Sequence, residues 1–116
     1  MVKLFKRRYL AFKLVTKSNY SKDKIMDALI KAIPKIEGEH TSDIRNLRII
    51  DYDGMSGFGI IRCNNKLVNV LRSSFKNMSK FSLDIISAEV FGVSGTIRAL
   101  KQKFLRYLRN KPKFRN

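Results

Sequence analysis

Segments with the apolar spacing of strands and segments with the apolar spacing of helices follow one another in a definite order along this 116-residue chain. That order constrains the fold more than any other feature of the sequence. Alternating apolar residues that are β-branched or aromatic predict strands, whereas apolar residues that recur every three or four positions predict helices. Strands are predicted over residues 9–15, 47–53, 58–63 and 82–93. Helices are predicted to begin after N-cap residues at Ser21, at Asn64 or Asn65, and at Ser94. The resulting order is strand, helix, strand, strand, helix, strand, helix.

This order predicts an α+β fold in which two βα units share one antiparallel sheet. The architecture is ferredoxin-like, or RNA-recognition-motif-like: an α-β sandwich with the order βαββαβ, the sheet order 4-1-3-2 and an extra basic C-terminal helix. The first strand should turn Leu10, Phe12 and Leu14 towards the core. The first two helices carry apolar stripes made of Ile25, Met26, Leu29, Ile30, Ile33 and Ile36, and of Leu67, Val70, Leu71, Phe75 and Met78. Pro34 should kink or shorten the first helix.

A single domain is expected over residues 1–116, with a basic lead (1–8), a globular body (9–109) and a basic tail (110–116). Hydrophobic residues make up 44% of the chain, which favours a folded body over a disordered arm. No apolar run approaches the roughly 20 residues that cross a bilayer, and no signal peptide is evident, so we expect a cytoplasmic protein without membrane contact. Cys63 lies in an apolar run and should be a buried thiol.

Positive charge is concentrated at the two ends of the chain. Residues 1–22 contain seven Lys and Arg, residues 90–116 contain eight, and neither stretch contains an Asp or Glu, so the ends carry +15 of the net +16. Between them, ten basic residues meet nine acidic ones, a sum of +1. Unpaired like charge costs self-repulsion that nothing in the chain offsets, so this distribution favours a polyanionic partner, with nucleic acid as the first candidate.

The predicted topology brings these two basic ends together. The first and fourth strands are neighbours and antiparallel, so the start of the first and the end of the fourth meet at one end of the sheet. Lys6, Arg7 and Arg8 should therefore lie near the turn at residues 92–96, and Arg62, at the end of the third strand, should point to the same rim. Two basic stretches in sequence thus become one predicted surface patch.

The string Gly92-Val93-Ser94-Gly95-Thr96-Ile97-Arg98 opens the third predicted helix. Backbone N–H groups and the helix dipole at such a glycine-flanked turn can hold a phosphate, and a plain helix cap explains the same residues equally well. The string is also similar to a nucleophile elbow, although Thr96 replaces the last glycine and His40 is the only histidine available as a base. The residues predicted to bind nucleic acid, with RNA as the expected ligand, are Lys6, Arg7, Arg8, Arg62, Ser94, Gly95, Thr96, Arg98, Lys101, Lys103 and Arg106.

Residues 56–63, Ser-Gly-Phe-Gly-Ile-Ile-Arg-Cys, partly match the RNP1 pattern of RNA-recognition motifs. Both glycines and Phe58 agree with the pattern. Ser56, Ile60 and Cys63 replace its basic residue and two of its aromatic residues, so most groups that stack bases are missing. We therefore favour a hairpin shaped by Gly57 and Gly59, in which Phe58 packs against a neighbour, over a base-stacking sheet.

Enzymatic chemistry has little support in the sequence. One His, one Cys and nine carboxylates give neither metal-ligand spacing nor a nucleophile with an evident partner. Asp51 and Asp53 lie two apart on one predicted strand and could bind a divalent ion, but such a pair is more often a solvated strand end before an Asp-Gly turn. We predict no catalytic residue and no metal site in this chain, and His40 is expected in a surface loop.

Three strings in this order and spacing give the chain a resemblance to a known family. They are residues 8–12, residues 59–63 before a helix, and residues 92–97 before a basic helix. Over residues 7–106 the chain resembles the archaeal ribonuclease P protein component 2 family. The resemblance implies an RNA-recognition-motif-like fold without a standard stacking platform, in agreement with the incomplete RNP1 match.

The resemblance also implies a role and partners. Ribonuclease P removes the 5′ leader of precursor tRNA, and in the archaeal enzyme the RNA subunit performs the hydrolysis with divalent metal such as Mg²⁺. The implied partners are the ribonuclease P RNA, the barrel-fold protein component 3 in a two-plus-two assembly, the other ribonuclease P proteins and, indirectly, precursor tRNA. Exposed apolar residues of the first two helices are candidates for the protein contact. Two alternatives stay open: a ribosomal or other structural RNA-binding protein, and a ferredoxin-like domain with a small-ligand pocket, of which the even charge of residues 23–89 gives no hint.

Overall fold

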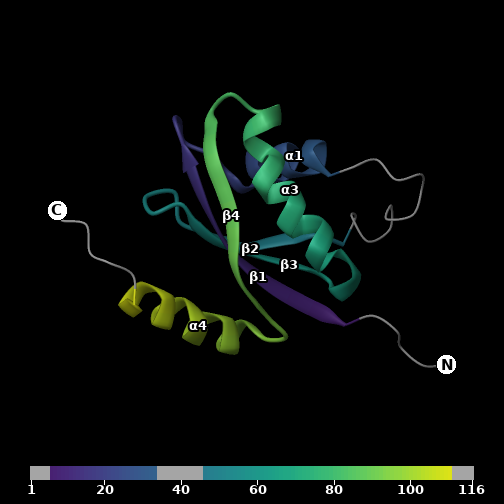
Figure 1. Cartoon of the computed structure of the whole chain (residues 1–116), viewed down its shortest axis with the longest axis vertical. Coiled ribbons are helices and arrows are strands. Elements are labelled where there is room, and N and C mark those ends of the chain that lie inside the picture. The colour runs from purple at the N-terminus through teal and green to yellow at the C-terminus, as the bar shows by residue number, and fades with distance from the viewer. Residues whose placement is uncertain (1–5, 34–45, 111–116) are drawn as a thin grey trace.

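A computed structural model of the chain describes residues 6–33 and 46–110, with side chains as far as Lys103. Four strands form one sheet, in the order β2-β3-β1-β4 and with every neighbouring pair antiparallel (Figure 1). The elements are β1 (Arg7–Thr16), α1 (Lys22–Ala32), β2 (Arg48–Tyr52), β3 (Phe58–Asn64), η1 (Asn65–Leu67), α3 (Val68–Phe81), β4 (Ile85–Ser94) and α4 (Ile97–Asn110). The predicted fold class, sheet order and additional C-terminal helix are confirmed. Pro34, Ile36, His40, the start of the basic lead and the tail after residue 110 lie outside the described residues, whereas the helix that Pro34 is predicted to shorten is described and ends at Ala32.

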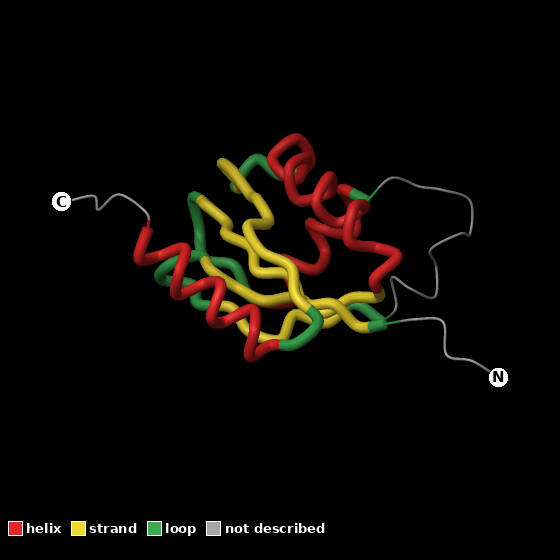
Figure 2. The backbone as a smooth tube through the Cα atoms, turned by 60° about the horizontal axis from the view of Figure 1, so that its bottom comes forward, coloured by secondary structure: helices red, strands yellow, loops and turns green. Residues whose placement is uncertain are grey.

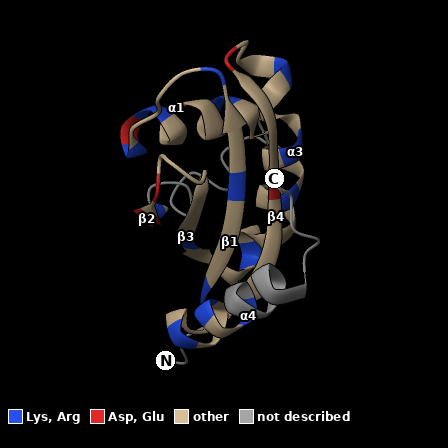
Figure 3. Ribbon diagram, turned by 90° about the vertical axis from the view of Figure 1, so that its left-hand side faces the viewer, with Lys and Arg blue, Asp and Glu red and all other residues tan. Residues whose placement is uncertain are grey.

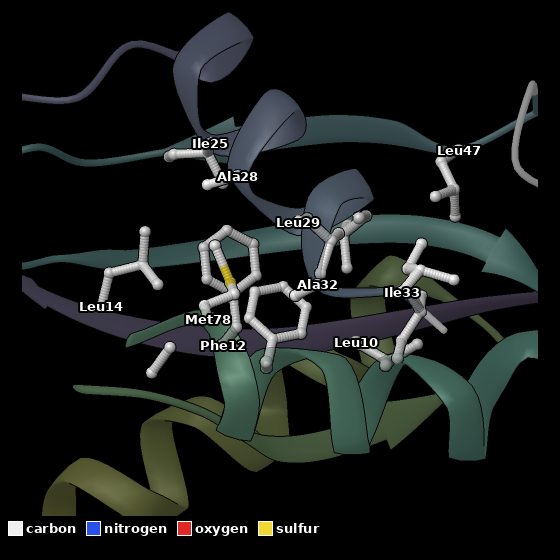
Figure 4. Close-up of a cluster of buried hydrophobic side chains, with 14 of the residues drawn as sticks. Leu10, Phe12, Leu14, Ile25, Ala28, Leu29, Ala32, Ile33, Leu47 and Met78 are labelled. Carbon is white, nitrogen blue, oxygen red and sulfur yellow. The ribbon is translucent and has the colours of Figure 1, made fainter. Parts of the chain in front are cut away.

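One face of the sheet packs on α1 and α3 to form the main core. Leu10, Phe12 and Leu14 of β1 are buried, as their alternation predicts. The Phe12 ring stacks on Phe75 of α3 with centroids 4.9 Å apart, and Figure 4 shows Phe12 beside Met78, beneath α1. Burying this many large apolar side chains supplies most of the stability of a domain of this size, at roughly 1.5–3 kcal/mol for each.

The first helix begins and ends where the local sequence dictates. The Ser21 hydroxyl accepts a hydrogen bond from the Lys24 N–H at 3.2 Å and caps α1, as predicted. The helix stops at Ala32, and Ile33 is extended (φ −73°, ψ 127°), because a residue that precedes a proline avoids the helical region. Its buried face differs from the predicted stripe, since Ala28 and Ala32 are buried whereas Ile30 is 43% exposed. Small residues let the helix approach the sheet closely.

The second predicted helix starts later than its polar residues suggest. The Asn64 side chain accepts from the Lys66 N–H at 3.0 Å, but it caps the short 3-10 helix η1, and α3 begins only at Val68. Its apolar stripe packs as predicted, with Leu67, Leu71, Phe75 and Met78 fully buried. Strand β4 likewise starts at Ile85 instead of residue 82. Residues 82–84 form a turn, in which the Ile85 N–H donates to the Ser82 carbonyl.

The third major helix lies on the other face of the sheet. In Figure 2, α1 and α3 lie on one side of the strands and α4 crosses the opposite side. Leu100 of α4 is fully buried there, and it lies close to Gly92 and Ala11, which face away from the main core. The cap differs from the prediction: Ser94 ends β4, and the Thr96 hydroxyl accepts from the Ala99 N–H at 3.1 Å. The face on which RNA-recognition motifs stack bases is thus partly covered by α4.

Candidate nucleic-acid interface

The strand pairing brings the predicted basic residues to one end of the sheet. Arg7 lies opposite Asn64, and Tyr9 lies opposite both Arg62 on β3 and Ser94 on β4. Lys6 is tied to η1 because the Asn65 N–H donates to the Lys6 carbonyl at 2.8 Å. A Cβ atom placed on Gly95 would lie 3.5 Å from Nη1 of Arg8, so the turn before α4 and the start of β1 are in contact. The predicted convergence is confirmed.

The start of α4 adds three more cations to this end. Arg98, Lys101 and Lys103 are exposed, and the Lys103 ammonium donates to the Val93 carbonyl at 2.6 Å. In Figure 3, Lys and Arg colour the start of β1 and the first turns of α4. We call the following set the cationic end: Lys6, Arg7, Arg8, Arg62, Arg98, Lys101 and Lys103. In the described part of the chain none of these side chains is paired with a carboxylate, and the Arg106 side chain lies outside that part.

The turn before α4 presents backbone donors beside the cationic end. The Thr96 hydroxyl occupies the Ala99 N–H, and the Leu100 N–H makes the first bond of the helix to the Thr96 carbonyl at 3.1 Å. Within the described hydrogen bonds, the N–H groups of Ile97 and Arg98 remain available to an anion. The cap and the phosphate interpretations are therefore compatible, because Thr96 caps the helix without using every donor at its N-terminus.

The RNP1-like segment is a hairpin whose aromatic residue is engaged by neighbours. Gly57 has φ +82°, and a Cβ atom there would lie 2.1 Å from the Leu14 carbonyl oxygen. The Phe58 ring meets Phe91 edge-on at 5.4 Å, and the Lys13 ammonium lies 5.0 Å from its centroid. The prediction that glycines shape this hairpin and that Phe58 packs against a neighbour is confirmed.

A cavity of about 300 Å³ lies between the hairpin and α4, on the face of the sheet opposite the main core. It is lined by Ala11, Asp51, Asp53, Ser56, Phe58, Gly59, Ile60, Phe91, Leu100 and Lys101. The even charge of residues 23–89 offers no hint of such a pocket, and the cavity is visible only in the structure. Phe91 reaches the cavity because β4 has a bulge: the ladder passes from Gly92 opposite Ala11 to Val90 opposite Phe12.

The two neighbouring aspartates have separate environments. Asp53 accepts from the Met55 N–H at 3.1 Å and from the Ser56 hydroxyl at 3.0 Å, so it holds the turn between β2 and β3. Asp51 lies on β2 opposite Ile60 and lines the cavity. Among the described residues no group of three or more His, Cys, Asp or Glu side chains could hold a metal ion. The turn interpretation agrees with the geometry of Asp53, whereas Asp51 is an exposed residue of β2 that takes no part in the turn.

Cys63 is a buried structural residue. Its side chain is 2% exposed in the main core, and burial raises the pKa of its thiol from 9.0 to about 12, although the charge of Arg8 acts in the opposite direction. A thiol is nucleophilic only as the thiolate, so this environment suppresses its reactivity. Burial also raises the pKa of the Tyr52 hydroxyl, and the neighbouring Asp53 carboxylate adds to the shift.

Fold and surface together define a class: an RNA-binding α+β protein with an RNA-recognition-motif-like sheet and a cationic end. Residues 8–105 match the model of the Rpp14/Pop5 family, and the chain belongs to this family of ribonuclease P protein subunits. It is 33% identical over 100 residues to ribonuclease P protein component 2 of Pyrococcus horikoshii, covering 86% of this chain and 83% of that protein. The protein of the same name from Methanosarcina mazei is 29% identical over 100 residues, which cover 86% of this chain and 84% of that protein. The one from Methanocaldococcus jannaschii is 31% identical over 100 residues, which cover 86% of this chain and 73% of that protein.

Proposed function

We propose that this subunit supports the RNA-catalysed removal of the 5′ leader from precursor tRNA by binding and stabilising the ribonuclease P RNA. The observation that carries the proposal is the cationic end, where three separate segments bring together seven basic side chains that have no carboxylate partner among the described residues. Folded RNA brings phosphates close to one another, and fixed cations lower their repulsion. The protein needs no catalytic residue in this role, since divalent metal such as Mg²⁺ held by the RNA supplies the hydrolytic chemistry. We expect it to act in the cytoplasm.

Cleavage of precursor tRNA at low magnesium tests this role directly. A cognate ribonuclease P RNA is assayed alone, with component 3 alone, and with component 3 plus this protein. We expect cleavage to appear only in the last mixture, and high magnesium to reduce the requirement for protein, because both supply positive charge to the RNA. Equal cleavage with and without this chain would contradict the proposal, and the cationic end should then be tested against ribosomal RNA.

Exposed apolar side chains at the other end of the sheet support a protein partner. Val15, Met55, Phe81, Leu83 and Ile86 are exposed, and they lie where β1 and α3 end, where β4 begins and where the β2–β3 hairpin turns. We call this group the apolar end. The ten residues of β1 separate Val15 from Arg7 and Arg8, the part of the cationic end at the start of that strand, which leaves room for RNA and protein to be bound at the same time. No helix in the described residues is long and apolar enough to span a membrane.

We propose that component 3 contacts the apolar end, in the two-plus-two assembly expected for this family. The double substitution Phe81→Ala and Leu83→Ala should weaken binding of component 3 by about tenfold or more, since the two side chains are 56% and 91% exposed and their packing adds stability only in the complex. Ile30→Ala is the matched control, because Ile30 is also exposed but lies on α1, the alternative contact face. Titration calorimetry measures both. A loss with Ile30→Ala alone would assign the contact to α1.

A further inference from the structure

The cavity beside α4 combines an apolar interior with a few polar groups at its edge. Ala11, Ile60 and Leu100 supply aliphatic walls from three different elements, and the rings of Phe58 and Phe91 supply the aromatic part. A volume of about 300 Å³ lies at the small end of the range for ligand pockets, which suits a single planar ring system better than an extended ligand. Aromatic side chains that line a slot of this size are typical of sites for unstacked nucleobases.

Asp51 gives the cavity a carboxylate that accepts no hydrogen bond from the described residues. Asp53 uses both of its carboxylate oxygens to hold the hairpin turn, whereas Asp51 makes no side-chain hydrogen bond or ion pair within the described residues. A carboxylate on an RNA-facing surface repels phosphate, so it contributes to binding where it accepts from a donor of the nucleotide. In a cavity lined by Phe58 and Phe91 the donor beside Asp51 would be an N–H group of a base. Its position therefore points to a base edge and away from the RNA backbone.

Basic side chains flank the same cavity. Lys101 of the cationic end lines it directly, and the Lys13 ammonium lies against the Phe58 ring, 5.0 Å from the centroid. Arg62 follows Ile60 by two positions on β3 and so lies on the same face of the sheet. A nucleotide whose base entered the cavity would thus keep its phosphates beside cations, with a carboxylate only at the base edge.

We propose that this cavity binds one unstacked nucleobase of an RNA strand, with guanine preferred. Guanine presents two adjacent N–H donors on its Watson–Crick edge, which match the two oxygens of the Asp51 carboxylate. Uracil presents one N–H between two carbonyl oxygens that the carboxylate would repel. The inference rests on the proposed RNA-binding function and adds a base preference to it, because phosphate contacts alone do not discriminate between bases.

The experiment compares short uridine oligoribonucleotides that carry one central guanosine, one central inosine, or uridine throughout. Inosine lacks the exocyclic amino group of guanosine and is otherwise the same shape. We expect the guanosine strand to bind the full-length protein about tenfold more tightly than the inosine strand, the change expected for one lost hydrogen bond to a charged acceptor. Fluorescence anisotropy at several salt concentrations measures both the preference and the salt slope.

Two variants separate the base contact from general electrostatics. Asp51→Asn keeps the shape but replaces one acceptor by a donor, so the guanosine preference should disappear while binding of the uridine strand is not weakened. Glu89→Gln is the matched control: Glu89 is an exposed carboxylate on the same sheet face, opposite Lys13, and it does not line the cavity. It should keep the preference. Circular dichroism confirms that both variants are folded.

The outcomes distinguish this inference from the proposed function. Normal salt-dependent binding without a base preference in the wild-type protein would overturn the cavity as a base site and leave RNA binding intact. An absence of RNA binding would overturn both. A final arm titrates guanosine monophosphate and follows the Phe58 and Phe91 ring signals by NMR. If the free nucleotide saturates the site while RNA strands show no guanosine preference, the RNA strand is the wrong source of the base.

Discussion

Reversing two charges on α4, with Arg98→Glu and Lys101→Glu, is expected to weaken RNA binding by at least about tenfold at low salt and to flatten its salt dependence. Both side chains are exposed at the cationic end, next to the turn that Arg8 contacts. Each lost phosphate contact lowers the slope of log K against log salt by about 0.7–0.9, so the slope should fall by nearly two. Measurement of the affinity for ribonuclease P RNA at four or more salt concentrations gives this slope.

The control places the same charge change elsewhere. Lys76 and Lys80 are exposed on α3, which covers the opposite face of the sheet, and their double reversal to Glu alters the net charge by the same amount. It should reduce affinity slightly through the long-range field and leave the slope within error of the wild type. A slope that is unchanged in the α4 variant would remove α4 from the RNA interface. Equal losses in both variants would mean that net charge alone governs binding.

The sheet and its cationic end could be predicted from the sequence because both depend on local patterns and a small choice of topologies. Leu10, Phe12 and Leu14 alternate as only a half-buried strand does, and few connections of four strands and two helices are compatible with right-handed crossovers. Once the first strand lies between the third and the fourth, Arg8 and Gly95 must be neighbours. The charges at the two ends of the chain then meet without any further assumption.

The position of α4 could not be predicted in this way. An apolar stripe that includes Leu100 shows that the helix packs on something, but it does not identify the surface, and the open face of the sheet is one of several choices. The cap was also ambiguous, because Ser94 and Thr96 are both good N-cap residues two positions apart. The cavity depends on this helix and on the bulge at Phe91, so it was invisible until the tertiary structure was known.

Gly57→Ala is expected to lower the free energy of unfolding by about 3 kcal/mol or more. Among the described residues, Gly57 has a positive φ, +82°. A side chain at such a position costs about 1–2 kcal/mol in backbone strain alone. The new Cβ atom would also lie 2.1 Å from the Leu14 carbonyl oxygen, so the backbone must shift. That shift disturbs the 2.8 Å hydrogen bond from the Leu14 N–H to the Gly57 carbonyl, which ties β1 to the hairpin. Urea denaturation measures the change.

Gly54→Ala provides the comparison within the same turn. Apart from its chain neighbours, no heavy atom of the described residues lies within 4 Å of the position that its Cβ would occupy, so the substitution should change the free energy of unfolding by less than about 0.5 kcal/mol. Similar losses for the two variants would show that the turn tolerates neither alanine and that the Leu14 contact is not the cause. The expected difference between them also bears on function, because Gly57 lies between Asp53 and Phe58, and both line the cavity. Gly57, the first glycine of the RNP1-like string, is therefore expected to be required for the shape of the hairpin. The Gly57→Ala variant should lose the guanosine preference even where the protein still folds.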